Sequence, residues 1–323
     1  MGNKPGLTFA LCLLLAACQR LPDAAPHTVY VSDEEADVIH VIENGEKVAA
    51  IPTGERPRGM GVSPDGRTLY VAASDSNRIE AVDLATRKVT RHLTSGPDPE
   101  WFAVSPDGRR IYIANEDDAK VSFLDIATNK ILMETDVGAE PEGMAVSPDG
   151  RWVICTSETA SLVHFIDART GELVESAMVG TRPRAAIFTD DGKRLWITAE
   201  VRGTITVFDM ETRRPLHTID LLRENPPQPA QTVHMVTSPD ESRIYVALGR
   251  GNHVAEIDAK TYRVLRYAPS GFRNWGIGIS PDGKLIYAAS GLSHDVAVID
   301  AASMKRIKVI KTGGKPWGVV VTP

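Results

Sequence analysis

The chain has 323 residues and a formal net charge of −6 at pH 7, and 42% of its residues are hydrophobic. This acidic balance argues against nucleic-acid binding, which needs a basic stripe, and the length is enough to bury a large core. Beyond the first 20 residues, no apolar run approaches the roughly eighteen residues that a membrane-spanning helix needs.

The first 17 residues are expected to be a signal peptide. Lys4 supplies a positive charge, and the apolar stretch of residues 7–17 is too short to cross a bilayer of ~30 Å as a helix. The segment Leu15-Ala16-Ala17-Cys18 resembles a bacterial lipobox, which implies cleavage before Cys18 and a lipid on its thiol. A plain secretory signal with an incidental cysteine is the alternative. Residues 18–27 would then be a lipidated tether.

The predicted location follows from this leader. Gln19 stands where an inner-membrane retention signal would favour Asp, so by resemblance we expect a periplasm-facing lipoprotein of the outer membrane. Membrane contact would be through the lipid alone. Cys155 is the one cysteine after Cys18, and it lies in a predicted strand, so we expect a buried, inert thiol.

One turn sequence returns at a fixed interval through the rest of the chain. The turn Ser63-Pro64-Asp65-Gly66 is followed by related turns at intervals of 42, 42, 42, 49 and 42 residues, which begin at Ser105, Ser147, Thr189, Ser238 and Ser280. Proline presets φ at its position, and glycine adopts the left-handed conformation that closes the hairpin. Such a period is typical of a repeat architecture.

Each repeat contains four short segments of strand-like sequence. In the first full repeat these segments are residues 59–62 before the turn, residues 69–72 after it, a third ending in Val82-Asp83, and residues 88–93. Four short strands in about 42 residues are typical of one blade of a β-propeller, and no segment has a sustained helical period. The sequence therefore predicts an all-β fold of four-stranded blades.

The ends of the repeat region predict how the ring closes. Residues 29–31 align with the second strands of the other repeats, and residues 315–322 align with the first strands. Six complete units and one blade shared by both termini make seven blades. We therefore expect a seven-bladed β-propeller over residues 28–323, closed by pairing of the N- and C-terminal strands, which removes the open sheet edges.

These repeats resemble the YVTN-type β-propeller family. The regular 42-residue units, the lipoprotein leader and the ending Pro316-Trp317-Gly318-Val319 are also similar to the propeller lipoproteins associated with PQQ-dependent alcohol catabolism. That resemblance implies a functional neighbourhood rather than an activity of the chain itself.

The candidate functional residues lie at the predicted mouth, where loops enter the first strand and leave the second. Elsewhere the blades repeat one another closely, whereas at three mouth positions they differ in charge and size. Counted from the turn serine, these positions hold Arg58, Glu100, Glu142, Arg184, Val233, Trp275 and Trp317; then Gly59, Trp101, Gly143, Ala185, His234, Gly276 and Gly318; and after the turn Glu34, Ser74, Glu116, Glu158, Glu200, Gly249 and Gly291.

Two interpretations of this mouth stay open. Glutamates, arginines, tryptophans and His234 together would offer charge recognition and rigid aromatic contact to a protein partner or a small ligand. Alternatively, a mouth is solvated and variable in any propeller, and Arg and Glu of adjacent blades form surface ion pairs. The insertion at residues 222–229, with three prolines, would enter the mouth beside His234 as a lid, or has no role.

Chemical motifs are scarce in the sequence. It has no nucleophile elbow, phosphate loop, zinc-protease motif or calcium loop. Direct binding of PQQ or haem is not expected, because the related propellers that bind these cofactors have eight blades. No metal site is expected, because Glu116, Glu158 and Glu200 lie on separate blades. We therefore expect no cofactor.

The expected function is a non-catalytic binding module of the cell envelope, associated with a periplasmic PQQ-enzyme or a transport component. The alternative is a propeller enzyme, lactonase-like or dehydrogenase-like, that uses His234 with mouth carboxylates.

Overall fold

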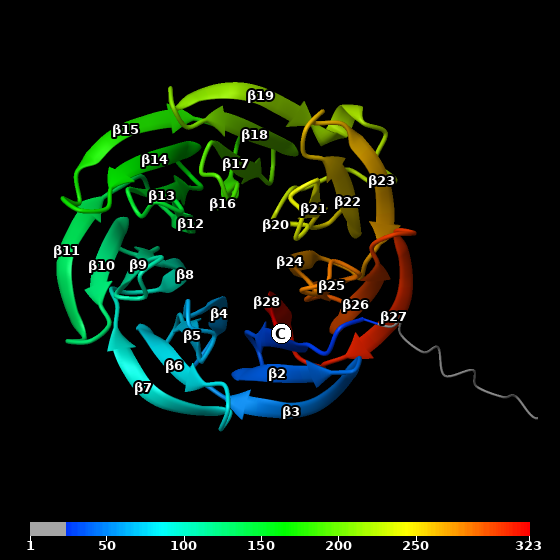
Figure 1. The fold of residues 1–323 in the computed structure, drawn as a ribbon, viewed down its shortest axis with the longest axis horizontal. Coiled ribbons are helices and arrows are strands. Elements are labelled where there is room, and N and C mark those ends of the chain that lie inside the picture. The colour runs from blue at the N-terminus through cyan, green and yellow to red at the C-terminus, as the bar shows by residue number, and fades with distance from the viewer. Residues whose placement is uncertain (1–23) are drawn as a thin grey trace, which may run out of the picture.

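The computed structural model describes residues 24–323, so the predicted signal peptide and the predicted lipidation site at Cys18 lie outside the described residues. Residues 24–323 form 28 strands in seven four-stranded antiparallel sheets, which stand around a central axis (Figure 1). This confirms the predicted seven-bladed all-β propeller. Within this part of the chain, no helix has the length and apolar character to cross a membrane.

Each blade begins with a strand beside the axis and continues outward. The innermost strands are β28 (Pro316–Thr322), β4 (Pro57–Val62), β8 (Pro99–Val104), β12 (Pro141–Val146), β16 (Pro183–Phe188), β20 (Met235–Thr237) and β24 (Asn274–Ile279). The second strands are β1 (Thr28–Asp33), β5 (Thr68–Ala73), β9 (Arg110–Asn115), β13 (Trp152–Ser157), β17 (Arg194–Ala199), β21 (Arg243–Ala247) and β25 (Leu285–Ser290). We number blades 1 to 7 in this order.

The two outer strands complete each blade. The third strands are β2 (Val38–Glu43), β6 (Arg78–Asp83), β10 (Lys120–Asp125), β14 (Leu162–Asp167), β18 (Thr204–Asp209), β22 (His253–Asp258) and β26 (Asp295–Asp300). The outermost are β3 (Glu46–Pro52), β7 (Lys88–Thr94), β11 (Lys130–Asp136), β15 (Leu173–Met178), β19 (Arg214–Asp220), β23 (Val264–Pro269) and β27 (Lys305–Lys311). A 3-10 turn, η1 (Leu221–Arg223), follows β19.

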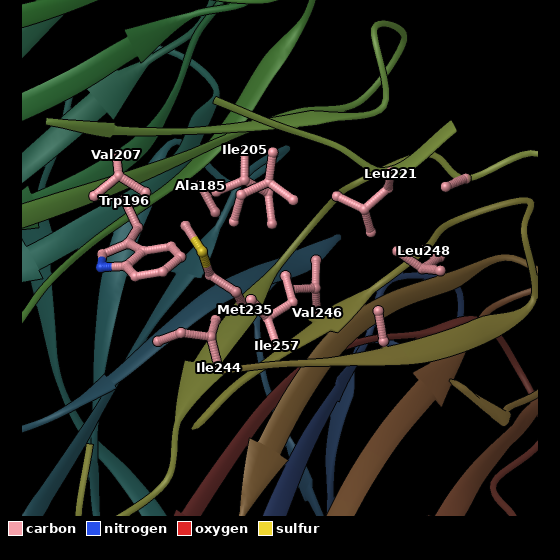
Figure 2. Packing of buried hydrophobic residues seen from close by; sticks show 13 residues of the cluster. Ala185, Trp196, Ile205, Val207, Leu221, Met235, Ile244, Val246, Leu248 and Ile257 are labelled. Atoms are coloured by element: carbon pink, nitrogen blue, oxygen red, sulfur yellow. The ribbon is translucent and has the colours of Figure 1, made fainter. Parts of the chain in front are cut away.

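The blades pack face to face through apolar side chains. Between blades 5 and 6, Trp196 and Val207 lie against Met235, Ile244 and Ile257 in one buried cluster (Figure 2). Second and third strands are buried along almost their whole length, because both faces of each sheet are covered by neighbouring blades. Each such aliphatic side chain contributes roughly 1.5–3 kcal/mol by leaving water.

The repeated turn has the geometry that its sequence predicts. The Gly66 amide donates to the Ser63 carbonyl at 2.8 Å, and Gly66 has a φ of +69°. The Asp65 carboxylate accepts from the Ser63 hydroxyl at 2.5 Å, which fixes the turn from inside. In blade 6 the glycine position is held by Glu241, which takes a φ of +53° despite its side chain.

The ring closes in blade 1 by pairing of the two ends of the described chain. β1 pairs antiparallel with β28, with Thr28 opposite Thr322 and Val31 opposite Val319. The sheet order is β28-β1-β2-β3, as the alignment of the termini predicts. The last strand is therefore a structural part of the ring.

Candidate functional site

The mouth is the face where loops enter the innermost strands and leave the second strands. Glycines after the first mouth position let adjacent blades approach closely. A Cβ on Gly143 would lie 2.4 Å from the Arg184 carbonyl oxygen, and one on Gly276 would lie 2.3 Å from that of Trp317. Glycine permits such close backbone approach, and the side chains of the neighbouring blades are thereby drawn together around the axis.

Four aromatic rings from four blades meet at the axis inside the mouth. The ring centroid of Trp101 lies 4.6 Å from that of His234 and 5.4 Å from that of Trp317. His234 and Trp317 are 5.1 Å apart, and Trp275 and Trp317 are 6.4 Å apart. Because Trp101 stands on β8 and His234 precedes β20, these contacts cross the axis (Figure 1).

Arg184 is the centre of a buried ion-pair network on blades 4 and 5. Its guanidinium lies 2.9 Å from Glu142, contacts Glu158 directly, and lies 3.8 Å from Glu200. Arg182 joins the same network at 2.6 Å from Glu158. Burial raises the pKa of Glu142 well above its usual value, against the opposing effect of Arg184. The carboxyl of Glu142 is therefore harder to ionise than that of an exposed glutamate.

Arg58 and Arg56 form a second network on blades 1 to 3. Arg58 lies 3.0 Å from Glu34 and 2.7 Å from Glu100, and Arg56 lies 3.0 Å from Glu100. Glu116 stands beside this network. Burial, together with the charge of Glu100, raises the pKa of Glu116 to about 8. The carboxyl of Glu116 thus carries a proton at neutral pH.

Arg273 links the mouth to Gln231, which lies two residues after the proline-containing insertion. Its guanidinium lies 3.0 Å from Glu200, donates to the Gln231 side-chain oxygen at 2.9 Å, and lies 4.0 Å from the centroid of Trp275. Gln231 also accepts from the Arg250 amide at 3.2 Å. Burial, with the nearby charges of Arg250 and Arg184, lowers the pKa of Arg273.

The insertion itself does not form a lid over the mouth. Leu221, the first residue of the η1 turn, is buried. The Tyr267 hydroxyl on the outer strand β23 donates to the Glu224 carbonyl at 3.1 Å. The bulk of the loop lies at the outer side of the ring, near β19 and β23 (Figure 1). Gln231, two residues after the insertion, reaches the mouth through its hydrogen bond with Arg273.

His234 is neutral and has an unused nitrogen. Burial and the charge of Arg184 lower the pKa of His234 to about 3, although a backbone hydrogen bond to Trp275 opposes this shift. The Nδ1 atom has no hydrogen-bond partner among residues 24–323. The same holds, within those residues, for Nε1 of Trp317. An unpaired buried polar atom is costly, and a ligand that bonds to it recovers this cost.

A cavity of about 290 Å³ lies along the axis beside these groups. His234, Arg184 and Trp101 line its polar part, and apolar residues from the innermost strands line the rest, among them Ala186, Ile187, Met144, Met235, Ile277 and Val319. Small-molecule sites are concave, mainly apolar and carry a few polar groups. The volume is at the lower end of the ~300–1,000 Å³ range for such sites, so it suits a small ligand.

One group of three carboxyl side chains has the spacing that a metal ion needs. Oxygens of Asp98, Glu100 and Glu116 lie within 4.8 Å of one another. However, Glu100 is already paired with two arginines, and Glu116 is protonated. Protonated carboxyls are poor ligands for a cation. Glu158 and Glu200 lie apart from this group, in the Arg184 network.

The predicted mouth residues are brought together, but mostly below the surface rather than on a solvated rim. The residues that are buried are Glu100, Glu142, Glu158, Glu200, Arg184, His234 and Trp317, whereas Glu34, Arg58, Trp101, Glu116 and Trp275 are half-buried. The expected Arg–Glu pairs form, and those of Arg184 with Glu142 and Glu158 are buried, where water screens them little.

Other residues of the site were missed by sequence reasoning. Arg56, Asp98, Arg182, Gln231 and Arg273 stand two positions before the first mouth position of their blades, and they form much of the ion-pair network. Their position also varies from blade to blade in charge and size. This variation was the signal that would have found them.

Two family models match parts of the chain. The family described as "Lactonase, 7-bladed beta-propeller" matches residues 162–305, and the "Cytochrome D1 heme domain" matches residues 100–186. Each covers less than half of the chain. The lactonase match includes Arg184, Glu200, His234 and Arg273. No curated protein matches the sequence at a significant level.

Similar solved structures share the fold at low sequence identity. A protein assigned as a 6-phosphogluconolactonase from Bacteroides fragilis has a TM-score of 0.76 at 18% identity, over 93% of this chain and 99% of that one. Kuenenia stuttgartiensis hydrazine synthase has 0.70 at 22%, over 81% and 88%. The dihydro-heme d1 dehydrogenase NirN, in complex with DHE, has 0.67 at 19%, over 91% and 74%.

These comparisons correct the expected function. The prediction of a non-catalytic binding module is wrong, because the partial match to the lactonase family favours the alternative, a propeller enzyme. The physical reason for the error is that scattered residues of separate blades converge on one buried cavity. The chain is a seven-bladed propeller similar to the lactonase and cytochrome D1 propeller families.

Proposed function

We propose that the protein is a hydrolase of the lactonase type, which opens a small cyclic ester in the cavity beside His234. The observation that carries this proposal is the state of His234: buried, neutral, and with Nδ1 unpaired among the described residues at the wall of a cavity that Arg184 also lines. The partial lactonase family match contains both residues and supports this choice.

The groups of the site suit the steps of ester hydrolysis. Water attacks the carbonyl carbon, and its proton passes to Nδ1 of His234. The guanidinium of Arg184 stabilises the negative charge that develops on the carbonyl oxygen. The bond from the carbonyl carbon to the ring oxygen then breaks. His234 gives the proton that it took from water to this ring oxygen, while Glu142, 2.9 Å from Arg184, holds the guanidinium in place.

The substrate would be small and would have an apolar part. The cavity of about 290 Å³ has walls from Ala186, Ile187 and Met235 below the polar groups. A lactone of one ring with a few substituents has this character. We therefore propose a small lactone as the ligand of the mouth.

The test measures the turnover of a panel of small lactones, and a pH-stat records the acid that their hydrolysis releases. The wild-type protein should hydrolyse at least one of them, and Ala186→Leu, which fills the cavity, should abolish that turnover while the fold remains intact by circular dichroism. Ala139→Leu, at an exposed position of the mouth, is the matched control and should keep the activity. A folded wild-type protein without turnover on the whole panel would refute the proposal.

A dehydrogenase-like reaction with a tetrapyrrole is the second candidate, because the cytochrome D1 match covers residues 100–186. The site supports it less well. Both Trp101 and Trp317 lie against the ring of His234, and the cavity is small for a macrocycle. Titration with haem, read by its Soret band, distinguishes the two candidates, because only the second predicts a stoichiometric complex.

The setting of the enzyme is also proposed rather than shown. The leader supports an envelope lipoprotein that faces the periplasm from the outer membrane, and the repeat resembles the YVTN type. An association with a periplasmic PQQ-enzyme or transport component rests on the family resemblance alone. Crosslinking of the lipoprotein in membranes, followed by identification of the captured protein, tests it.

A further inference from the structure

The first described residues are fixed to one face of the ring. We call this the lower face: it carries the Ser-Pro-Asp-Gly turns and lies opposite the mouth. The Ala25 amide donates to the Asp282 carboxylate at 2.8 Å, and His27 Nε2 bonds to the Tyr287 hydroxyl at 2.7 Å. The His27 ring also meets that of Tyr287 edge-on, with centroids 5.6 Å apart.

The acidic side chain that binds this segment is that of Asp282. Although burial opposes the shift, hydrogen bonds from Ser280 and from the Ala25 amide lower the pKa of Asp282 to about 2. The carboxylate is therefore charged at any physiological pH. Ala24 also packs against the apolar cluster shared by blades 7 and 1. The segment from Ala24 to His27 is thus held by polar and apolar contacts together.

The segment occupies a groove that has empty counterparts in other blades. Grooves of about 500–600 Å³ lie at the lower face between blades 6 and 7, 3 and 4, 5 and 6, and 1 and 2. An aromatic residue lines each of them, at the position equivalent to Tyr287: Tyr245, Tyr112, Trp196 and Tyr30. At Tyr287 the chain's own Ala24–His27 segment lies in the groove. The point at which the chain leaves the ring toward its N-terminus is therefore defined.

The mouth loops of blades 3 and 4 are more acidic than the turns of the lower face. The mouth loops of blades 3 and 4, at residues 95–100, 115–119, 137–142 and 157–161, contain eight Asp and Glu residues and neither Lys nor Arg. On the lower face, each of five turns carries one Asp, at positions 65, 107, 149, 191 and 282, and an exposed basic residue two positions later, which is Arg67, Arg109, Arg151, Lys193 or Lys284. Anionic lipid headgroups attract Lys and Arg and repel carboxylates.

We propose that the lower face is the membrane-facing side of the protein and that the mouth opens away from the membrane. The proposal rests on the lipid predicted at Cys18 and not on the lactonase activity. Cys18 and Ala24 are six positions apart, and even a fully extended chain covers at most ~3.6 Å per residue, so the predicted anchor is at most about 22 Å from Ala24 on the lower face. A substrate would then reach the mouth from the aqueous phase.

The test places fluorescent labels on the two faces of the full lipoprotein in vesicles of phosphatidylethanolamine and phosphatidylglycerol. Arg109→Cys labels the lower face and Leu292→Cys, an exposed position at the mouth, labels the other. Cys155 does not interfere, because it is buried and burial raises the pKa of its thiol, as expected from its strand. Headgroup-nitroxide lipid is the quencher.

The label at residue 109 should lose most of its emission, while the label at residue 292 keeps most of its own. The double variant His27→Ala with Asp282→Asn frees the segment, so the difference between the two labels should shrink while the thermal unfolding of the ring persists. Equal quenching of both labels in the parent protein, or stronger quenching at residue 292, would overturn the proposal. So would a protein without a lipid-modified Cys18, shown by mass spectrometry and failure to bind vesicles.

Discussion

The indole of Trp101 lies 4.6 Å from the imidazole of His234, although blades 3 and 6 carry these residues on opposite sides of the ring. Their contact covers one side of the residue on which the proposed chemistry depends. It also explains why His234 is 6% exposed despite its place in a mouth.

Removal of the Trp101 ring should change the acidity of His234. The pKa of His234 is about 3 mainly because the ring is buried, so Trp101→Ala should admit water and raise this pKa by more than one unit toward 6.5. NMR titration of the imidazole protons measures it. Trp101→Phe keeps the cover and should leave the pKa low; equal values in the alanine variant and the wild type would contradict the account.

The Glu116 carboxyl should make the protein less stable at alkaline pH. Its pKa in the folded protein, about 8, lies above the usual 4.5, so its contribution to stability is fully present below pH 4.5 and is lost as pH rises through 8. Glu116→Gln mimics the protonated form. We expect it to stabilise the protein at pH 9 by on the order of 1–2 kcal/mol, since solvent screens a half-buried group.

Urea unfolding at pH 5, 7 and 9 measures this effect. The wild type should lose stability relative to Glu116→Gln as pH increases, and the two should converge near pH 5. Asp117→Asn, at the exposed neighbouring position, serves as the control and should follow the wild type. Parallel curves for Glu116→Gln and wild type would show that the carboxyl is not perturbed.

Gln231 should act on the mouth by holding Arg273. Gln231→Ala removes the acceptor that lies 2.9 Å from the guanidinium, and a hydrogen bond to a charged group is worth about 1.5–3 kcal/mol. Arg273 would then lose its fixed position over Trp275. We expect KM for the best lactone to rise about tenfold with a smaller change in kcat. Gln231→Glu, which keeps an acceptor, should keep KM near the wild-type value. An unchanged KM would mean that Gln231 has no effect on the site.

Deletion of residues 316–323 should open the ring. The deletion removes β28, which pairs with β1 from Val31↔Val319 to Thr28↔Thr322, and it removes the buried ring of Trp317. Two blades thereby lose a packed neighbour on the axis side. We expect a large fall in the melting temperature and rapid proteolysis from the N-terminal strands, whereas deletion of Pro323 alone should have little effect. A cooperative, unshifted transition in the longer deletion would contradict the closure.

Much of the fold was predictable from the sequence because it depends on local, repeated features. The turns beginning at Ser63, Ser105 and Ser147 fix the blade length, and the alignment of residues 29–31 with later second strands predicts the shared blade. Such signals are carried by neighbouring residues in the chain. The confirmed ring and its closure are their direct consequence.

The convergence of the mouth residues was harder to predict. The repeat places Trp101, Arg184 and His234 at known positions within their blades, but whether their side chains meet depends on side-chain length and on how closely the glycine-lined strands approach one another. The sequence alone therefore favoured solvated ion pairs and a binding module. It also left open whether the insertion forms a lid or has no role, because the direction of this loop depends on the packing of Leu221 and Tyr267 at the outer side.

The most direct test of the central claim is the kcat/KM of His234→Gln on the best lactone, compared with that of His92→Gln. His92 lies on the outer strand β7 and is largely exposed, so its replacement controls for the loss of a histidine. General acid–base catalysis contributes about 10²–10⁴-fold, and we expect a loss of this size for His234→Gln and none for His92→Gln. Equal kcat/KM values for the two variants would contradict the assignment of His234 as the centre of the site.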